Sequence, residues 1–258
     1  MPDPARAMSK EDALAELERL ATRGRIKLDG HACVNTVGLL GFDPVTGEDR
    51  PGNVAGVVLR DGNQNNVAIA PARLDPRNAL ALVRFCRFLT ENFNVTELFH
   101  LGLDGGGHTA DGVARTDCHG QGRALDFAGV TMPVGDVNRR ITVLNHWGTV
   151  ATSSTPEGEW PAFLAAEMHY RLDDPDASPL GDPDGDMFVA DFFRSVYDFV
   201  AGEWQDRSDG ADPADTPTAI GERSLILHPD HPATSPAAPG RIVQRNHIHM
   251  QIGKSGTE

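Results

Sequence analysis

Four residues at two distant places in the sequence have types and spacings suited to metal chemistry. His119 and Asp126 are separated by six residues within DCHGQGRALDF, and His247 and His249 form a His-x-His pair within NHIHMQIG. On a β-strand, residues i and i+2 point to the same face, so both imidazoles of the pair can reach one point in space. Together these residues offer the three nitrogen or oxygen ligands that a catalytic zinc needs.

Four candidates for three ligand positions leave one residue free for acid–base chemistry. A neutral His beside a metal-activated water can take up its proton and later protonate a leaving group. Each motif also has a simpler interpretation, because a His near Gly is most often a polar turn residue and a strand His-x-His is more often a surface feature. The coincidence of the two motifs in one chain favours the metal site.

Cysteine usage does not indicate a disulfide framework. The chain has three cysteines, Cys33, Cys86 and Cys118, in no regular spacing, which favours a reducing compartment. Cys118 adjoins His119 and could be a ligand or a nucleophile. Alternation along a strand favours a Cys118 side chain that points to the opposite face.

Length and charge restrict the class of protein. The chain has 258 residues and a formal net charge of −14, which argues against nucleic acid as a partner. No apolar run has the length of a membrane span, and the first residues lack the apolar region of a secretory signal. We therefore expect a protein that is cytoplasmic as synthesised, and that is delivered or released if it acts on a cell wall.

The order of expected elements mixes helices and strands without a regular βαβ rhythm, which favours an α+β fold. Capping signals at Ser9 and at Asp75-Pro76 predict two helix starts. We expect a single domain over residues 1–258, with an N-terminal helix and a long insertion, 131–220, between the two metal motifs. Expected helices cover 9–23, 75–93, 160–172 and 187–204, and expected strands cover 95–103, 122–132, 139–148, 224–228 and 241–253.

The motifs resemble those of a zinc peptidase superfamily that groups lysostaphin-type enzymes, D-Ala-D-Ala carboxypeptidases and dipeptidases, and the Hedgehog N-terminal domain. HGQGRALDF fits the form H-x-x-G-x-A-x-D of the D-Ala-D-Ala and Hedgehog branch, and HIHMQI follows later. The resemblance implies zinc ligands at His119, Asp126 and His249, with His247 as the catalytic residue. It also implies a small antiparallel sheet with helices packed on one face, as in Hedgehog and the D-Ala-D-Ala peptidases.

The sequence departs from that branch in three ways. The branch has an Arg in the strand before the first motif, whereas LFHLGLDGGG has none, and RIVQRNHIH has no acidic residue near the second motif. The stretch between the motifs is also longer than in Hedgehog. In the Gly-rich loop, His108 could touch substrate or be a flexible loop residue. On the strand before it, Glu97 and His100 are expected on a solvated face rather than at the site.

The resemblance implies a zinc peptidase that hydrolyses an amide bond in peptidoglycan peptides by metal-activated water. The expected partner is the peptidoglycan peptide, with a delivery or immunity partner left open. An alternative from another class is a Hedgehog-like binding module in which zinc serves stability without turnover. A third is a zinc hydrolase that acts on something other than peptides.

Overall fold

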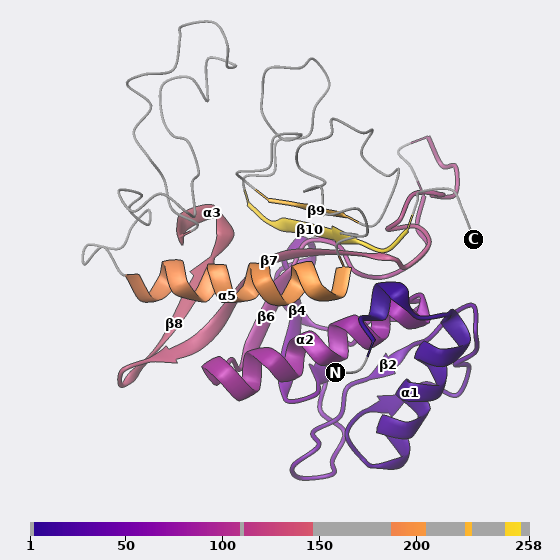
Figure 1. The fold of residues 1–258 in the computed structure, drawn as a ribbon, viewed down its shortest axis with the longest axis horizontal. Coiled ribbons are helices and arrows are strands. Elements are labelled where there is room, and N and C mark those ends of the chain that lie inside the picture. The colour runs from indigo at the N-terminus through magenta and orange to yellow at the C-terminus, as the bar shows by residue number, and fades with distance from the viewer. Residues whose placement is uncertain (1–2, 109–110, 147–186, 205–224, 229–245, 254–258) are drawn as a thin grey trace, which may run out of the picture.

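The computed structural model describes residues 3–108, 111–146, 187–204, 225–228 and 246–253 (Figure 1). The helices of the described chain are η1 (Ala5–Ala7), α1 (Lys10–Thr22), η2 (Gly62–Gln64), α2 (Pro76–Phe93), α3 (Val143–His146) and α5 (Met187–Trp204). The strands are β1 (Lys27–Leu28), β2 (Leu39–Leu40), β3 (Asn53–Val54), β4 (Val57–Asp61), β5 (Val67–Ala68), β6 (Glu97–His100), β7 (Ala124–Val134), β8 (Val137–Thr142), β9 (Leu225–Leu227) and β10 (Ile248–Gln251).

Local capping signals set the starts of the first two long helices. The Asp12 backbone N–H donates to Ser9 Oγ over 3.0 Å at the start of α1. At the start of α2, the Arg77 N–H donates to Asp75 Oδ1 over 2.9 Å, and Pro76 occupies the first turn. Side-chain acceptors at the cap satisfy N–H groups that have no partner within the helix. Both predicted helix starts are confirmed.

One sheet of eight strands carries the fold, in the order β3-β4-β6-β7-β10-β9, with β5 beside β4 and β8 beside β7. Its pairs are antiparallel except for β4 and β6, which are parallel. The expectation of a small antiparallel sheet is therefore met only in part, because β4 and β6 pair in parallel. Parallel neighbours need a crossover connection, and α2 lies in the segment that joins β4 to β6.

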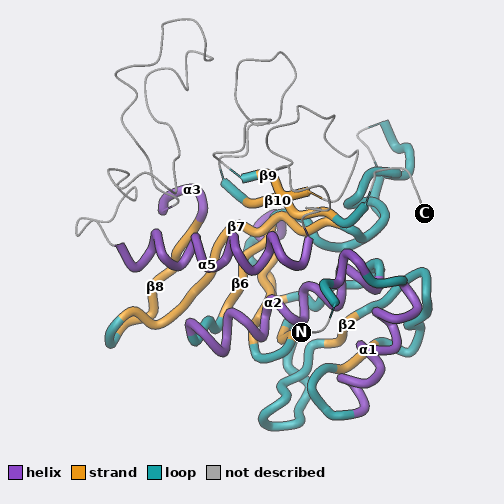
Figure 2. The backbone as a smooth tube through the Cα atoms, viewed as in Figure 1, coloured by secondary structure: helices purple, strands orange, loops and turns teal. Residues whose placement is uncertain are grey.

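The long helices cover one face of the sheet, as expected for this α+β arrangement. Figures 1 and 2 show α2 and α5 side by side in front of the strands, while α1 packs against α2. The core includes a cluster of aromatic rings: the centroid of the Phe85 ring lies 5.4 Å from that of Phe127 on β7 and 6.0 Å from that of Trp204 on α5, in edge-to-face contacts. The opposite face of β7 and β10 is left for the polar residues of the site.

Parts of the 131–220 stretch belong to this sheet and core. β7 continues to Val134 and pairs with β8 over six residue pairs, and α5 buries Phe192 and Phe193 fully. The strand expected at 139–148 ends at Thr142, where the chain turns into α3. The helix expected at 160–172 lies outside the described residues.

Candidate metal centre

A turn at residues 117–122 leads into β7 and positions His119. The Gly122 N–H donates to the His119 carbonyl over 2.9 Å, and the Gly120 N–H donates to Asp117 Oδ1 over 2.8 Å. Gly122 has a φ of +66°, and a Cβ there would lie 2.2 Å from the Arg73 carbonyl oxygen. The glycine of the H-x-x-G motif is therefore required by both its conformation and its close approach to a neighbouring loop.

Strand pairing brings the two motifs together. β10 runs antiparallel to β7 with His249 directly opposite Asp126. Directly opposite residues of an antiparallel pair point to the same face, so their side chains meet. His249 Nδ1 lies 2.7 Å from Asp126 Oδ1.

The turn completes a group of three metal-ligand side chains. His119 Nε2 lies 3.2 Å from Asp126 Oδ2. One ligand atom from each of His119, Asp126 and His249 lies within 4.8 Å of the others. This nitrogen and oxygen set can hold a divalent ion such as zinc, and it is called the triad below.

Asp126 and His249 each shift the pKa of the other. Burial by itself would raise the pKa of Asp126, but hydrogen bonds from His119 and His249 and their positive charge outweigh it and hold that pKa well below its usual range. Burial would lower the pKa of His249, but the contact with the Asp126 carboxylate raises it above its usual value. The carboxylate is therefore ionised in any solution near neutrality, as a metal ligand must be.

His247 lies at the edge of the triad. Its Nε2 is 3.5 Å from Asp126 Oδ1, and its Nδ1 is 2.7 Å from Asn246 Oδ1. Burial lowers the pKa of His247, because the charged imidazolium loses solvation there. With Asn246 as acceptor at Nδ1, the neutral ring presents the lone pair of Nε2 toward the triad.

Gln251 accepts a hydrogen bond from His249 on the side of the ring that faces away from Asp126. Its Nε2 donates to the Gly253 carbonyl over 3.3 Å, which turns the amide oxygen Oε1 to within 3.0 Å of His249 Nε2. An amide oxygen only accepts, so a proton of His249 stays on Nε2. The proton that Nδ1 shares with Asp126 would be displaced by a metal ion, which leaves Nδ1 as the ligand nitrogen. Gln251 was not predicted as a site residue, although the spacing His249-x-Gln251 on a strand signals a shared face.

Replacing Gln251 with Leu tests this orientation. We expect the substitution to weaken metal affinity by about 10–100-fold, the usual cost of losing an outer partner of a metal-bound His. Competition with a chromogenic chelator measures the affinity. Gln251→Glu is the matched control, because its carboxylate still accepts from Nε2–H. Equal affinity in wild type and Gln251→Leu would show that Gln251 does not orient His249.

Gly102 makes room for the triad from the neighbouring segment. The Asp126 N–H donates to the Gly102 carbonyl over 2.9 Å. A Cβ at Gly102 would lie 3.1 Å from Asp126 Oδ2 and 3.1 Å from His119 Cε1. Both ligands would have to move by a few tenths of an ångström to accept any side chain here.

We expect Gly102→Ala to weaken metal binding by about tenfold while the protein stays folded, because metal sites tolerate little displacement of their ligands. Gly30→Ala is the control, since a Cβ at Gly30 meets nothing within 4 Å. Chelator competition measures affinity, and circular dichroism checks the fold. Equal affinities in the two variants would contradict the argument from close approach.

Three other residues weighed in the sequence fall in different environments. His100 is buried at 5% exposure rather than solvated, and burial lowers its pKa. Glu97 is partly buried and binds Arg60 and Thr131 on the neighbouring strands. His108 is exposed and forms an isolated β-bridge with Ala114. Among the described residues, no hydrogen bond or ion pair links it to the triad.

Cys118 is neither a strand residue nor part of the triad. It lies in the turn before β7, is 2% exposed, and its Sγ is 3.7 Å from the Gly253 carbonyl oxygen. The prediction of Cys118 as a strand residue was wrong, because β7 begins only at Ala124. Cys118 is positioned by the turn, and its sulfur contacts Gly253, two residues past the end of β10.

Comparisons with known proteins add no relative to this picture. No family model matches the chain, and no match was found among curated proteins or solved structures. Among the described residues, no helix combines the length and apolar character needed to span a bilayer.

Proposed function

We propose that the protein is a zinc-dependent peptidase that hydrolyses an amide bond in peptidoglycan peptides. The single observation that carries the proposal is the triad with a neutral imidazole at its edge: His119, Asp126 and His249 as ligands, and His247 Nε2 at 3.5 Å from the ligand carboxylate. The peptidoglycan substrate rests on the resemblance of the two motifs to the zinc peptidases.

Each residue has a defined task in this proposal. The triad would hold the ion, which when bound supplies a Lewis acid that acidifies water and polarises a carbonyl. His247 takes up a proton at Nε2 as water attacks and returns it to the leaving amine. Asn246 keeps the His247 proton on Nδ1, so that Nε2 is free for that transfer.

The test is digestion of purified peptidoglycan by the zinc-loaded protein. We expect release of soluble fragments with new amino and carboxyl ends in equal number, loss of release with a chelator, and recovery when zinc is restored. Mass spectrometry of the fragments identifies the cleaved bond. A fully metal-loaded protein that releases no fragments would contradict the peptidoglycan substrate.

The second candidate function is a zinc-stabilised binding module without turnover. It is favoured by one observation: Asp126 is the only carboxylate in the metal-ligand group found among the described residues, and it would serve as a ligand. In a peptidase, His247 alone would therefore have to act as the general base. Substitution of His247 separates the two functions.

A further inference from the structure

Asp117 closes the turn that carries the metal ligand His119. Its carbonyl oxygen accepts from the Gln121 N–H over 3.0 Å, and its carboxylate Oδ1 accepts from the Gly120 N–H over 2.8 Å. An Asp at the start of a turn commonly satisfies backbone N–H groups a few residues further on in this way. Main chain and side chain of Asp117 therefore both hold the residues that follow His119.

Arg115 holds the Asp117 carboxylate in that position. Its Nε lies 3.1 Å from both carboxylate oxygens, and its Nη2 lies 2.5 Å from Oδ2. Such multiple contacts between a guanidinium and a carboxylate fix direction as well as distance. The two side chains are 36% and 49% exposed, and ion pairs this exposed add little net stability. The contribution of the pair is therefore the geometry of the turn.

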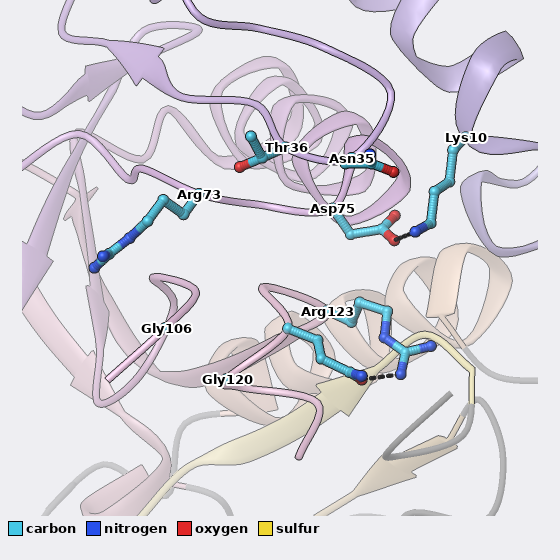
Figure 3. A pocket seen from close by; sticks show the side chains of 9 residues that line it. Lys10, Asn35, Thr36, Arg73, Asp75, Gly106, Gly120 and Arg123 are labelled. Carbon is cyan, nitrogen blue, oxygen red and sulfur yellow. Dashed lines mark hydrogen bonds and ion pairs between the residues drawn. The ribbon is translucent and has the colours of Figure 1, made fainter. Parts of the chain in front are cut away.

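The turn is also bonded to the Gly-rich loop, residues 104–108. The Gly106 N–H donates to the Gly120 carbonyl over 2.6 Å, and the Arg115 N–H donates to the Gly107 carbonyl over 3.1 Å. Figure 3 shows Gly106 and Gly120 on adjacent loops that border a cavity. A Cβ at Gly120 would lie 2.3 Å from the Arg115 carbonyl oxygen, so the segments are in close contact. Arg115 joins the two, because its N–H bonds to the loop and its guanidinium bonds to Asp117.

His119 is the member of the triad that depends most on such bonds. Asp126 and His249 lie opposite each other on paired strands, so the backbone ladder fixes both. His119 lies in the turn before β7, which begins only at Ala124, so the bonds of the turn fix it instead. A metal site needs its ligands within about 0.5 Å of the productive geometry. The turn therefore decides whether the third ligand is in place when an ion arrives.

We propose that Asp117 is a positioning residue for the metal ligand His119, and that Arg115 acts through Asp117. Asp117 is not itself in the group of ligand atoms. Its carboxylate keeps the His119 ring presented to the other two ligands, and a ligand that is already ordered loses less conformational freedom on binding. The inference deepens the proposed function and rests on its metal site, but not on peptide cleavage.

The experiment measures the affinity of the full chain for Zn²⁺ by competition with a chromogenic chelator and records the visible spectrum of the Co²⁺-loaded protein. We expect Asp117→Ala to weaken Zn²⁺ binding by about tenfold, as the loss of a capping acceptor or of an outer partner of a metal site does. The Co²⁺ bands should also change, because they report ligand geometry. Asp117→Asn keeps an acceptor oxygen for the Gly120 N–H and should stay close to wild type in both measurements.

Arg115→Met tests the second half of the proposal. It removes the donors to Asp117, so it should weaken Zn²⁺ binding by a smaller factor than Asp117→Ala and add nothing further in the Asp117→Ala background. It also carries the prediction if Asp117→Ala does not fold, which circular dichroism shows.

Asp111→Ala is the matched control. It removes an exposed carboxylate for which the described structure shows no hydrogen bond or ion pair to the turn, and it should leave affinity unchanged. The proposal is overturned by wild-type affinity in folded Asp117→Ala, by equal weakening in Asp111→Ala, or by an Arg115→Met effect that adds fully to that of Asp117→Ala. Wild-type protein without affinity for Zn²⁺ would overturn the metal site and this proposal together. A protein that binds Zn²⁺ as expected but cleaves no peptide would overturn only the peptidase function.

Discussion

Replacing His119 or Asp126 with Ala is expected to abolish stoichiometric metal binding. Wild-type protein should carry close to one divalent ion per chain, because the triad offers three ligand atoms within 4.8 Å of one another. Removing a direct ligand should lower metal affinity by more than the factor of about 10–100 that follows from removing an outer hydrogen-bond partner. Elemental analysis of protein purified without added chelator measures the stoichiometry and identifies the ion.

His108→Ala is the matched control for this experiment. It also removes an imidazole, but from an exposed residue that has no hydrogen bond or ion pair to the triad in the described structure. It should keep the full metal content, and circular dichroism should show all variants folded. Wild-type protein without metal, or full occupancy in folded His119→Ala, would show that the triad is not a metal site.

Replacing His247 with Ala is expected to lower kcat for peptide hydrolysis by about 10²–10⁴-fold, the usual contribution of a positioned acid–base group. Metal content should be unchanged, because His247 lies outside the group of ligand atoms. The loss should appear in kcat rather than in KM, since the lost group acts on the transferring proton. Steady-state kinetics with a released peptide fragment, together with elemental analysis, checks both parts.

Asn246→Ala is the companion to this substitution. It removes the oxygen 2.7 Å from His247 Nδ1, so it should lower kcat by a smaller factor than His247→Ala. An unchanged rate in metal-loaded His247→Ala would contradict its role as acid–base. A wild-type protein with metal but no turnover, whose partner affinity survives His247→Ala, would instead favour the binding module.

The elements with strong local signals were predictable from sequence. α5 spans Met187–Trp204, as its apolar pattern predicts, and α2 begins at Pro76 after its Asp75 cap. Caps and helical periodicity act over a few residues, so they are present in any short window of the chain. Strand ends were less predictable: the stretch expected to be a strand at 139–148 turns into α3 after Thr142.

The errors concern features that depend on partners far along the chain. The parallel pairing of β4 and β6 follows from the path of the α2 segment across the sheet, which periodicity does not reveal. The burial of His100 likewise depends on what packs around β6, and its environment was predicted wrongly as solvated. Strand pairing and burial are collective properties, so a local window carries little information about them.

The sequence alone determined which side chains could bind a metal, because residue type and an i, i+2 spacing on a strand already define donors and a shared face. Only the tertiary structure decided that His249 stands opposite Asp126, 123 positions away, rather than one register step aside. A slip of one residue would have turned both His of the pair to the core face. The close approach of Gly102 to Asp126 and His119 was also decided there, because it arises where separate segments meet.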